Sequence, residues 1–284
     1  MNLKNLQNVL MISIFGLLLF GCGQSSKVSD KKGTTSDGKE ASVEVEVFDA
    51  MKIKDQITEV INNSPKATEV AEFINKAGAS YILDLTVPID DVEKFMTETQ
   101  MGIGLGMYGF DLFYAKTFNR SDMVIKISEL EEQLIERLGL DNEFASTSNF
   151  RKRLQDNAEN QDSIDILVNE MMNRAHQNFS TSDQPGTYAL SFIGANAEAL
   201  YILTQVTLFA QNNKPMIEFI GKQDERANSI FTLLEMMSGD ENVKPYYEKM
   251  KPIAAYFEQH PEFTEKELKE ISPMIEAFRN EIFK

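Results

Sequence analysis

Beyond about residue 50, the apolar positions of the chain recur at helical spacing rather than in alternation. The clearest segment runs from Ser121 to Gly139, and its apolar stripe is Val124, Ile127, Leu130, Leu134 and Leu138. Residues three and four apart share one face of an α-helix, so the stripe predicts an amphipathic helix that ends at the glycine. A second stripe begins near Asp162 or Ser163 and continues through Ile164, Leu167, Val168, Met171, Met172 and Ala175.

Further segments carry the same periodicity. They begin at Ser64-Pro65, at Asp90 or Asp91 (to about Phe118), at Thr187 (to about Gln211), at Pro215 (to Gly239), at about Val243 (to Gln259) and at Thr264 (to Phe283). The Thr187 segment is almost wholly apolar, which predicts a central helix buried on most sides. An extended stretch, residues 81–87, ends at Pro88.

These patterns predict an all-α fold with eight or nine helices and no sheet, as a single domain over residues 51–284. Two arrangements remain open, a multi-helix bundle and a short stack of helical hairpins. The second is suggested by a faint similarity between residues 98–139 and 188–239. Each of these parts begins with small residues and ends in an amphipathic helix that stops at glycine.

The first 50 residues follow a different pattern. Lys4 precedes an apolar run from Val9 to Phe20, which is the layout of a secretory signal and is shorter than the ~20 residues of a membrane-spanning helix. Residues 23–42 offer scarcely any apolar side chain to bury, so we expect a disordered segment spanning roughly 25 Å. The alternating residues 43–47 have no evident partner strand. We therefore predict a signal peptide over residues 1–21 and a flexible tether over residues 22–50.

The stretch Leu19-Phe20-Gly21-Cys22 resembles the lipobox of bacterial lipoproteins, in which an aliphatic residue lies three positions before the cysteine and a small one directly before it. Phe20 stands where a small or aliphatic residue is usual. The resemblance implies that the Cys22 thiol takes a diacylglycerol, that the chain is cut after Gly21, and that the new amino group is acylated. The alternatives are a signal cleaved elsewhere and an uncleaved anchor.

Cys22 is the single cysteine of the chain, so no internal disulfide can form. Lipidation explains an exported lone cysteine at this position. Each buried methylene adds about 0.8 kcal/mol of membrane affinity, so two or three chains of the palmitate kind would hold the protein on the bilayer. Gln24, at the second position after Cys22, is compatible with sorting to the outer membrane, either on its periplasmic face or at the cell surface.

The charge balance argues against electrostatic membrane or nucleic-acid binding. The chain has 28 basic and 44 acidic residues and a net charge of −16, which becomes −17 when Lys4 leaves with the signal peptide. Nucleic acids and anionic headgroups bind through Lys and Arg that neutralise phosphate. We therefore expect the membrane contact to be the lipid on Cys22, and no nucleic-acid partner.

The layout as a whole resembles the uncharacterised all-helical bacterial lipoproteins of the Bacteroidota type. The resemblance rests on the lipobox, the Ser/Lys/Asp tether, and two segments, Gly-Met-Tyr-Gly-Phe-Asp-Leu-Phe-Tyr-Ala and Gly-Ala-Asn-Ala-Glu-Ala-Leu-Tyr-Ile-Leu. That group has no settled activity to carry over, so the resemblance implies a location rather than a chemistry.

No motif for catalysis or metal binding is evident. Zinc needs several Cys or His ligands, and apart from Cys22 the chain offers only His176 and His260. His260, before Pro261, is expected at a helix end, and His176 at the edge of an apolar stripe. The Gly102 to Gly109 stretch lacks the preceding strand of a nucleotide-binding loop, so we interpret it as close helix packing. We expect no cofactor, no metal and no enzyme activity.

Two carboxylates inside the most apolar helices are the least ordinary feature. Asp111 lies between Phe110 and Leu112, and Glu198 lies between Ala197 and Ala199. A buried charge is costly unless it is paired or protonated. One interpretation is a structural pair with Lys116, Arg120 or Arg174, or a solvent-facing side chain. The other is the floor of a ligand pocket, formed by Asp111, Tyr114, Asn196, Glu198 and Tyr201.

Three functions remain open on the sequence. The leading hypothesis is a membrane-anchored binding or scaffold lipoprotein that contacts another envelope protein or a peptide. The second is a small-ligand-binding lipoprotein with its pocket near Asp111 and Glu198. A hydrolase that uses carboxylates is the third.

Overall fold

The computed structural model describes residues 51–59, 61, 67–140, 149–181, 184–210 and 212–283. These residues form helices joined by turns, with no strand among them, so the all-α class predicted from the sequence is confirmed. The predicted signal peptide, Cys22 and the tether to residue 50 lie outside the described residues, as do Ser64 and Pro65.

The predicted number of helices, eight or nine, is wrong. The described part of the chain holds ten α-helices from α2 onward, besides the helical residues 51–59. The segment from Pro215 to Gly239 is two helices, α9 (Lys214–Gly221) and α10 (Asp224–Met237). Both bury one face in the same core, so the apolar spacing alone does not reveal the break. The short helix α6 (Phe150–Asp156) was also missed.

Residues 81–97 also differ from the prediction. The expected extended stretch contains a 3-10 turn, η1 (Leu83–Leu85), and Asp90 and Asp91 lie within a second 3-10 helix, η2 (Ile89–Lys94). Helix α3 (Glu98–Thr117) begins later, because Thr97 caps it: the Gln100 backbone N–H donates to Thr97 Oγ1 over 3.1 Å. The reciprocal bonds of this capping box fix the start of α3.

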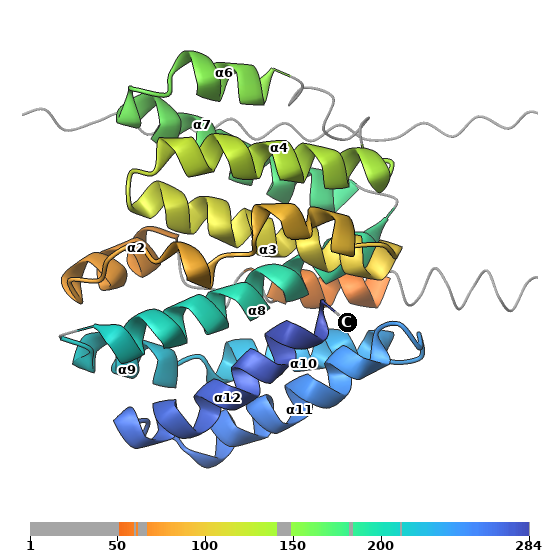
Figure 1. The fold of residues 1–284 in the computed structure, drawn as a ribbon. Coiled ribbons are helices and arrows are strands. Elements are labelled where there is room, and N and C mark those ends of the chain that lie inside the picture. Colours follow the sequence, from red (N-terminus) through yellow and green to blue (C-terminus); the bar gives the residue numbers. More distant parts are fainter. Residues whose placement is uncertain are drawn as a thin grey trace, which may run out of the picture.

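Helices α3 and α8 (Pro185–Phe209) cross in close contact at the centre of the fold (Figure 1). A Cβ atom on Gly106 would lie 1.8 Å from the Ser191 backbone oxygen, and one on Gly194 would lie 1.9 Å from the Ile103 oxygen. The Gly-rich stretch of α3 therefore serves close helix packing, as predicted. Helix α8 is long and apolar enough to cross a membrane, but 67% of its most apolar window is buried in the domain, as expected of a core helix.

The other helices form layers on either side of this central pair (Figure 1). On one side α3 packs against α4 (Ser121–Arg137), and α6 packs against α7 (Gln161–Thr181). On the other side α8 packs against α12 (Glu265–Glu281), which contacts α11 (Lys244–Gln259), and α11 contacts α10. Helix α2 (Ala67–Lys76) contacts α9. One apolar cluster extends through these layers, from Ile57 to Ile282.

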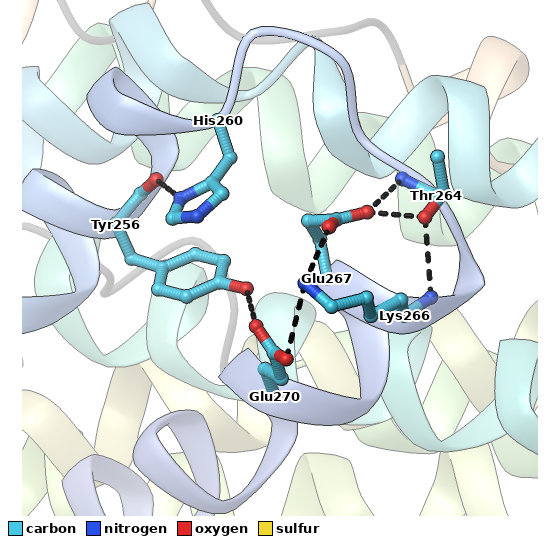
Figure 2. A network of polar contacts seen from close by, with 6 residues as sticks. All are labelled: Tyr256, His260, Thr264, Lys266, Glu267 and Glu270. Carbon is cyan, nitrogen blue, oxygen red and sulfur yellow. Dashed lines mark hydrogen bonds and ion pairs between the residues drawn. The ribbon is translucent and has the colours of Figure 1, made fainter.

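A polar network closes the turn between α11 and α12 (Figure 2). His260 follows the last residue of α11, its Nδ1 lies 2.8 Å from the Tyr256 carbonyl oxygen, and its ring stacks on the Tyr256 ring. This is the helix-end position predicted for His260. Thr264 and Glu267 form the capping box at the start of α12, in which the Thr264 backbone N–H donates to the Glu267 carboxylate. The hydrogen bonds from Thr264 lower the pKa of Glu267 to about 2. The Tyr256 hydroxyl donates to Glu270 over 2.7 Å, which joins the two helices.

Candidate ligand-binding pocket

The two carboxylates singled out in the sequence lie together inside the domain. Asp111 and Glu198 are both fully buried. The Arg279 side chain of α12 donates to Glu198 through Nε and Nη2, over 2.8 Å in each case, and through Nη2 to the Leu85 carbonyl oxygen over 3.3 Å. This bidentate geometry, with two parallel N–H···O bonds, is the strongest arrangement for an arginine and a carboxylate. The cluster therefore links α8, α12 and η1.

Asp111 is the third charged residue of this cluster. Its Oδ2 accepts a hydrogen bond from the Val87 backbone N–H over 2.8 Å, and its buried Oδ1 has no hydrogen-bond partner among the described residues. Burial and the adjacent Glu198 charge raise the pKa of Asp111 well above its usual range. The raised pKa favours a proton on Asp111, because two neighbouring buried carboxylates repel each other when both are ionised. Arg279 then balances the single negative charge of the pair.

The two tyrosines of the predicted pocket have structural contacts. The Arg279 guanidinium lies over the Tyr201 ring, 4.3 Å from its centroid. The Tyr114 hydroxyl accepts from the Ile82 N–H over 3.1 Å and faces the Ser80 carbonyl oxygen at 3.5 Å. A cation over an aromatic face is stabilised further by the ring.

The basic partners suggested from the sequence were wrong. Lys116 pairs with Asp165 at 3.7 Å, Arg120 with Asp122 at 3.0 Å, and Arg174 with Glu170 at 2.7 Å. The Arg120 and Arg174 pairs are local in sequence and the Lys116 pair joins α3 to α7, whereas the true partner, Arg279, comes from the last helix of the chain.

A separate pocket of about 430 Å³ lies among α2, α3, α4, α6, α7, α8 and α10. Its size falls within the roughly 300–1,000 Å³ of small-molecule sites. Much of its wall is aromatic or methionine side chain, contributed by Phe110, Phe113, Phe150, Met171, Met172 and Phe192. Such side chains give a large apolar surface, and methionine adapts its shape to an occupant.

Of the five residues predicted to form a ligand pocket, Asn196 lines this one. The other four, Asp111, Tyr114, Glu198 and Tyr201, are not among its lining residues, and their role in binding a ligand stays a prediction. A second hollow, of about 470 Å³, is lined by polar side chains such as Gln56, Glu59, Glu225 and Asn228. It lacks the apolar wall that drives the binding of small molecules.

Glu131 of α4 is a buried acid in the wall of the apolar pocket. Its side chain is almost fully buried, and its Oε2 has no hydrogen-bond partner among the described residues. Burial, with a smaller contribution from Glu132, raises the pKa of Glu131 to about 8. A Cβ atom on Gly109 would lie 3.5 Å from Glu131 Oε1, so the glycine leaves open space beside the carboxyl group. Glu131 is therefore mainly neutral at pH 7.

Arg226 of α10 is the basic residue of the same wall. Its Nε donates to Asn196 Oδ1, and the Asn196 amide nitrogen donates to the Phe192 carbonyl oxygen over 2.6 Å. Burial lowers the pKa of Arg226 to about 10, so the guanidinium still carries its charge at pH 7. Within the described part of the chain, no carboxylate lies within ion-pair distance of it.

Sequence reasoning missed three charged residues of this region. Glu131, Arg226 and Arg279 each lie on the apolar face of a helix: Glu131 follows Ile127 by four positions, Arg226 precedes Ile230 by four, and Arg279 follows Ile275 by four. A charge within an apolar stripe is a signal of burial, and it was available from the sequence.

Comparisons with known proteins leave the function to be argued from this geometry. No family model, no curated protein and no solved structure matches the chain. Among the described residues, no group of three or more His, Cys, Asp or Glu side chains comes together in a way that would hold a metal ion.

Proposed function

We propose that this protein is an envelope lipoprotein, anchored through acyl chains on Cys22, whose helical domain binds a small and largely apolar molecule. The pocket between α3, α4, α7 and α8 carries this proposal. It combines an apolar wall with a few buried polar groups, which is the composition typical of small-molecule sites. The ligand site therefore differs from the Asp111 and Glu198 site proposed on the sequence, and Asn196 is common to both.

The anchor is argued from the sequence. Cys22 stands where the lipobox requires it and is the only cysteine of the chain. A net charge of −16 disfavours an electrostatic contact with anionic lipid, so a covalent lipid is the simpler membrane attachment. The proposed location is the outer membrane of the cell envelope.

Mass spectrometry of the protein purified from its native membranes tests the anchor. We expect a first residue at position 22 and a mass increase of two or three acyl chains plus glycerol on the Cys22 peptide. An unmodified thiol, or a mature start elsewhere, would contradict the anchor and leave the pocket proposal untouched.

Binding of the uncharged fluorophore N-phenyl-1-naphthylamine tests the pocket. The mature chain, residues 22–284, is used with Cys22→Ser, which keeps lipid and detergent out of the assay. We expect saturable binding, and a loss of at least tenfold in affinity for Ala175→Phe, because Ala175 lines the pocket on α7.

The matched control for this variant is Asn173→Phe, which adds the same ring to an exposed position of the same helix. We expect it to bind the fluorophore as the unmodified protein does. The pocket proposal fails if the fluorophore does not bind, or if the two variants affect binding equally.

A protein or peptide partner is the second candidate function. Three large apolar side chains, Met96, Ile166 and Phe209, are between 66% and 75% exposed. Docking surfaces contain exposed apolar side chains gathered into contiguous patches, and these three are the candidates to contribute to one. Crosslinking in whole cells tests this candidate: it predicts one reproducible crosslinked product that is lost when the three residues are replaced by Ser, and it fails if no such product forms.

A further inference from the structure

The charges in the pocket wall do not balance. Arg226 is positively charged and half-buried, and its described contact is a neutral amide, that of Asn196. A buried charge without a counter-charge is costly. A charged group among the apolar side chains of a pocket sets the orientation and specificity of a ligand, so the guanidinium indicates what the pocket receives.

The acids of the same wall do not supply the missing charge. Glu132 lies 3.5 Å from Arg151 Nε and is thereby paired. Glu131 has a raised pKa and carries its proton for most of the time at pH 7. Burial is the first cause of this shift and the Glu132 charge the second, and no ion pair joins Glu131 to Arg226 among the described residues. Among the described lining residues, one positive charge therefore remains, and it lies in the same wall as the Phe and Met side chains.

We propose that the ligand is a long-chain carboxylate, whose carboxylate group binds Arg226 and whose hydrocarbon chain lies against the Phe and Met side chains of the pocket. This inference rests on the proposed function and names its ligand class. A carboxylate fits better than a phosphate monoester, because the wall offers one positive charge and a phosphate carries up to two negative ones. The planar guanidinium also matches the two oxygens of a carboxylate.

Asn196 holds the guanidinium in position. Its amide nitrogen is committed to the Phe192 carbonyl oxygen within α8, which turns its Oδ1 towards Arg226 Nε. Because Nε is engaged, the terminal nitrogens of Arg226 are left for the ligand. Asn196 is thus a positioning residue, and Glu131, with a free buried oxygen, offers a second hydrogen bond inside the pocket.

Isothermal titration of the mature Cys22→Ser chain with dodecanoate and dodecanol tests this inference. The two probes share a hydrocarbon chain and differ in charge. We expect dodecanoate to bind at least tenfold more tightly than dodecanol, since a charge-assisted contact is lost with the alcohol. Arg226→Gln should weaken the affinity for dodecanoate about tenfold or more and change the affinity for dodecanol by no more than about twofold. Arg120→Gln, which alters an exposed arginine outside the pocket, should change neither.

A second variant covers the case in which Arg226→Gln does not fold. Asn196→Asp places a carboxylate next to Arg226, and this carboxylate should compete with that of the ligand. The variant should therefore weaken the affinity for dodecanoate about tenfold without weakening the affinity for dodecanol. The inference is overturned if dodecanoate and dodecanol bind alike, or if both variants leave their ratio unchanged. If neither compound binds while the naphthylamine does, the ligand class is wrong and the pocket stands. If none of the three binds, the proposed function fails as well.

Discussion

Glu198 and Arg279 lie 81 residues apart in the sequence, and two hydrogen bonds of 2.8 Å join their side chains inside the domain. The pair connects the central helix α8 to the last helix α12, and the buried Asp111 of α3 interacts electrostatically with both of its members. Three helices that meet in the core are thus held in register by polar contacts that only this arrangement satisfies.

Breaking this pair should destabilise the domain strongly. Arg279→Met leaves the Glu198 charge buried without its partner, and removing one member of a buried ion pair costs about 3–5 kcal/mol. We expect a loss of this size in the free energy of unfolding, measured by urea denaturation. The double variant Glu198→Gln/Arg279→Met should recover part of the loss, because no uncompensated charge remains.

Lys269→Met is the matched control on the same helix. Lys269 pairs with Glu265 at the surface of α12, and both side chains are more than half exposed. Exposed pairs of this kind contribute about 0–1 kcal/mol. Equal losses for Lys269→Met and Arg279→Met would contradict a core role for the Glu198 and Arg279 pair.

Two glycines one turn apart on α3 should respond in opposite ways to a methyl group. Gly106→Ala would place its Cβ 1.8 Å from the Ser191 backbone oxygen, so α3 and α8 must separate. Overpacking of this kind costs about 1–3 kcal/mol or more. Gly109→Ala meets only Glu131 Oε1, at 3.5 Å, and should stabilise the helix by about 0.5–1 kcal/mol. Thermal unfolding of both variants measures the difference, and a tolerated Gly106→Ala would argue against the observed helix crossing.

Glu131 should make the domain less stable as the pH rises. Its pKa is about 8 in the folded domain and 4.5 in an unfolded chain, so between these values the folded chain holds a proton that the unfolded chain has released. The free energy of unfolding then falls by about 1.4 kcal/mol per pH unit for this group. Urea denaturation from pH 5 to 8 should show this slope.

Glu131→Gln serves as the comparison, because Gln keeps the shape of the side chain and does not titrate. Asp111 contributes a slope of the same sign in both proteins, so the difference between the two profiles isolates Glu131. We expect the free energy of unfolding of the Gln variant to fall less steeply with pH, by a slope that corresponds to about one proton. The variant should also be more stable at pH 8. Parallel profiles would mean that Glu131 is ionised in the folded domain.

Most of the helical architecture could be predicted from the sequence, because the outer long helices bury one continuous face and the central helix α8 is apolar almost throughout. The glycines of α3 were also interpreted correctly: no strand precedes them, and small residues in an apolar helix favour close packing. The break between α9 and α10 could not be predicted in this way, since two helices that bury the same face keep the spacing of one.

The site was predictable only in part. A carboxylate inside an apolar helix must find a partner, so the cluster of Asp111 and Glu198 could be anticipated. Which arginine pairs with Glu198 depends on how α12 returns to α8, and local spacing carries no information about that contact. The pocket is a property of several helices at once, and of its polar groups only Asn196 was named from the sequence.

Labelling the methionine methyl groups with ¹³C gives the most direct test of the pocket. Met171 and Met172 line it, whereas the exposed Met96 and Met236 lie outside its lining. When N-phenyl-1-naphthylamine is titrated into the mature Cys22→Ser chain, its aromatic rings should shift the Met171 and Met172 methyl resonances and leave those of Met96 and Met236 in place. Saturable binding with the Met171 and Met172 resonances unmoved would contradict a ligand site between α3, α4, α7 and α8.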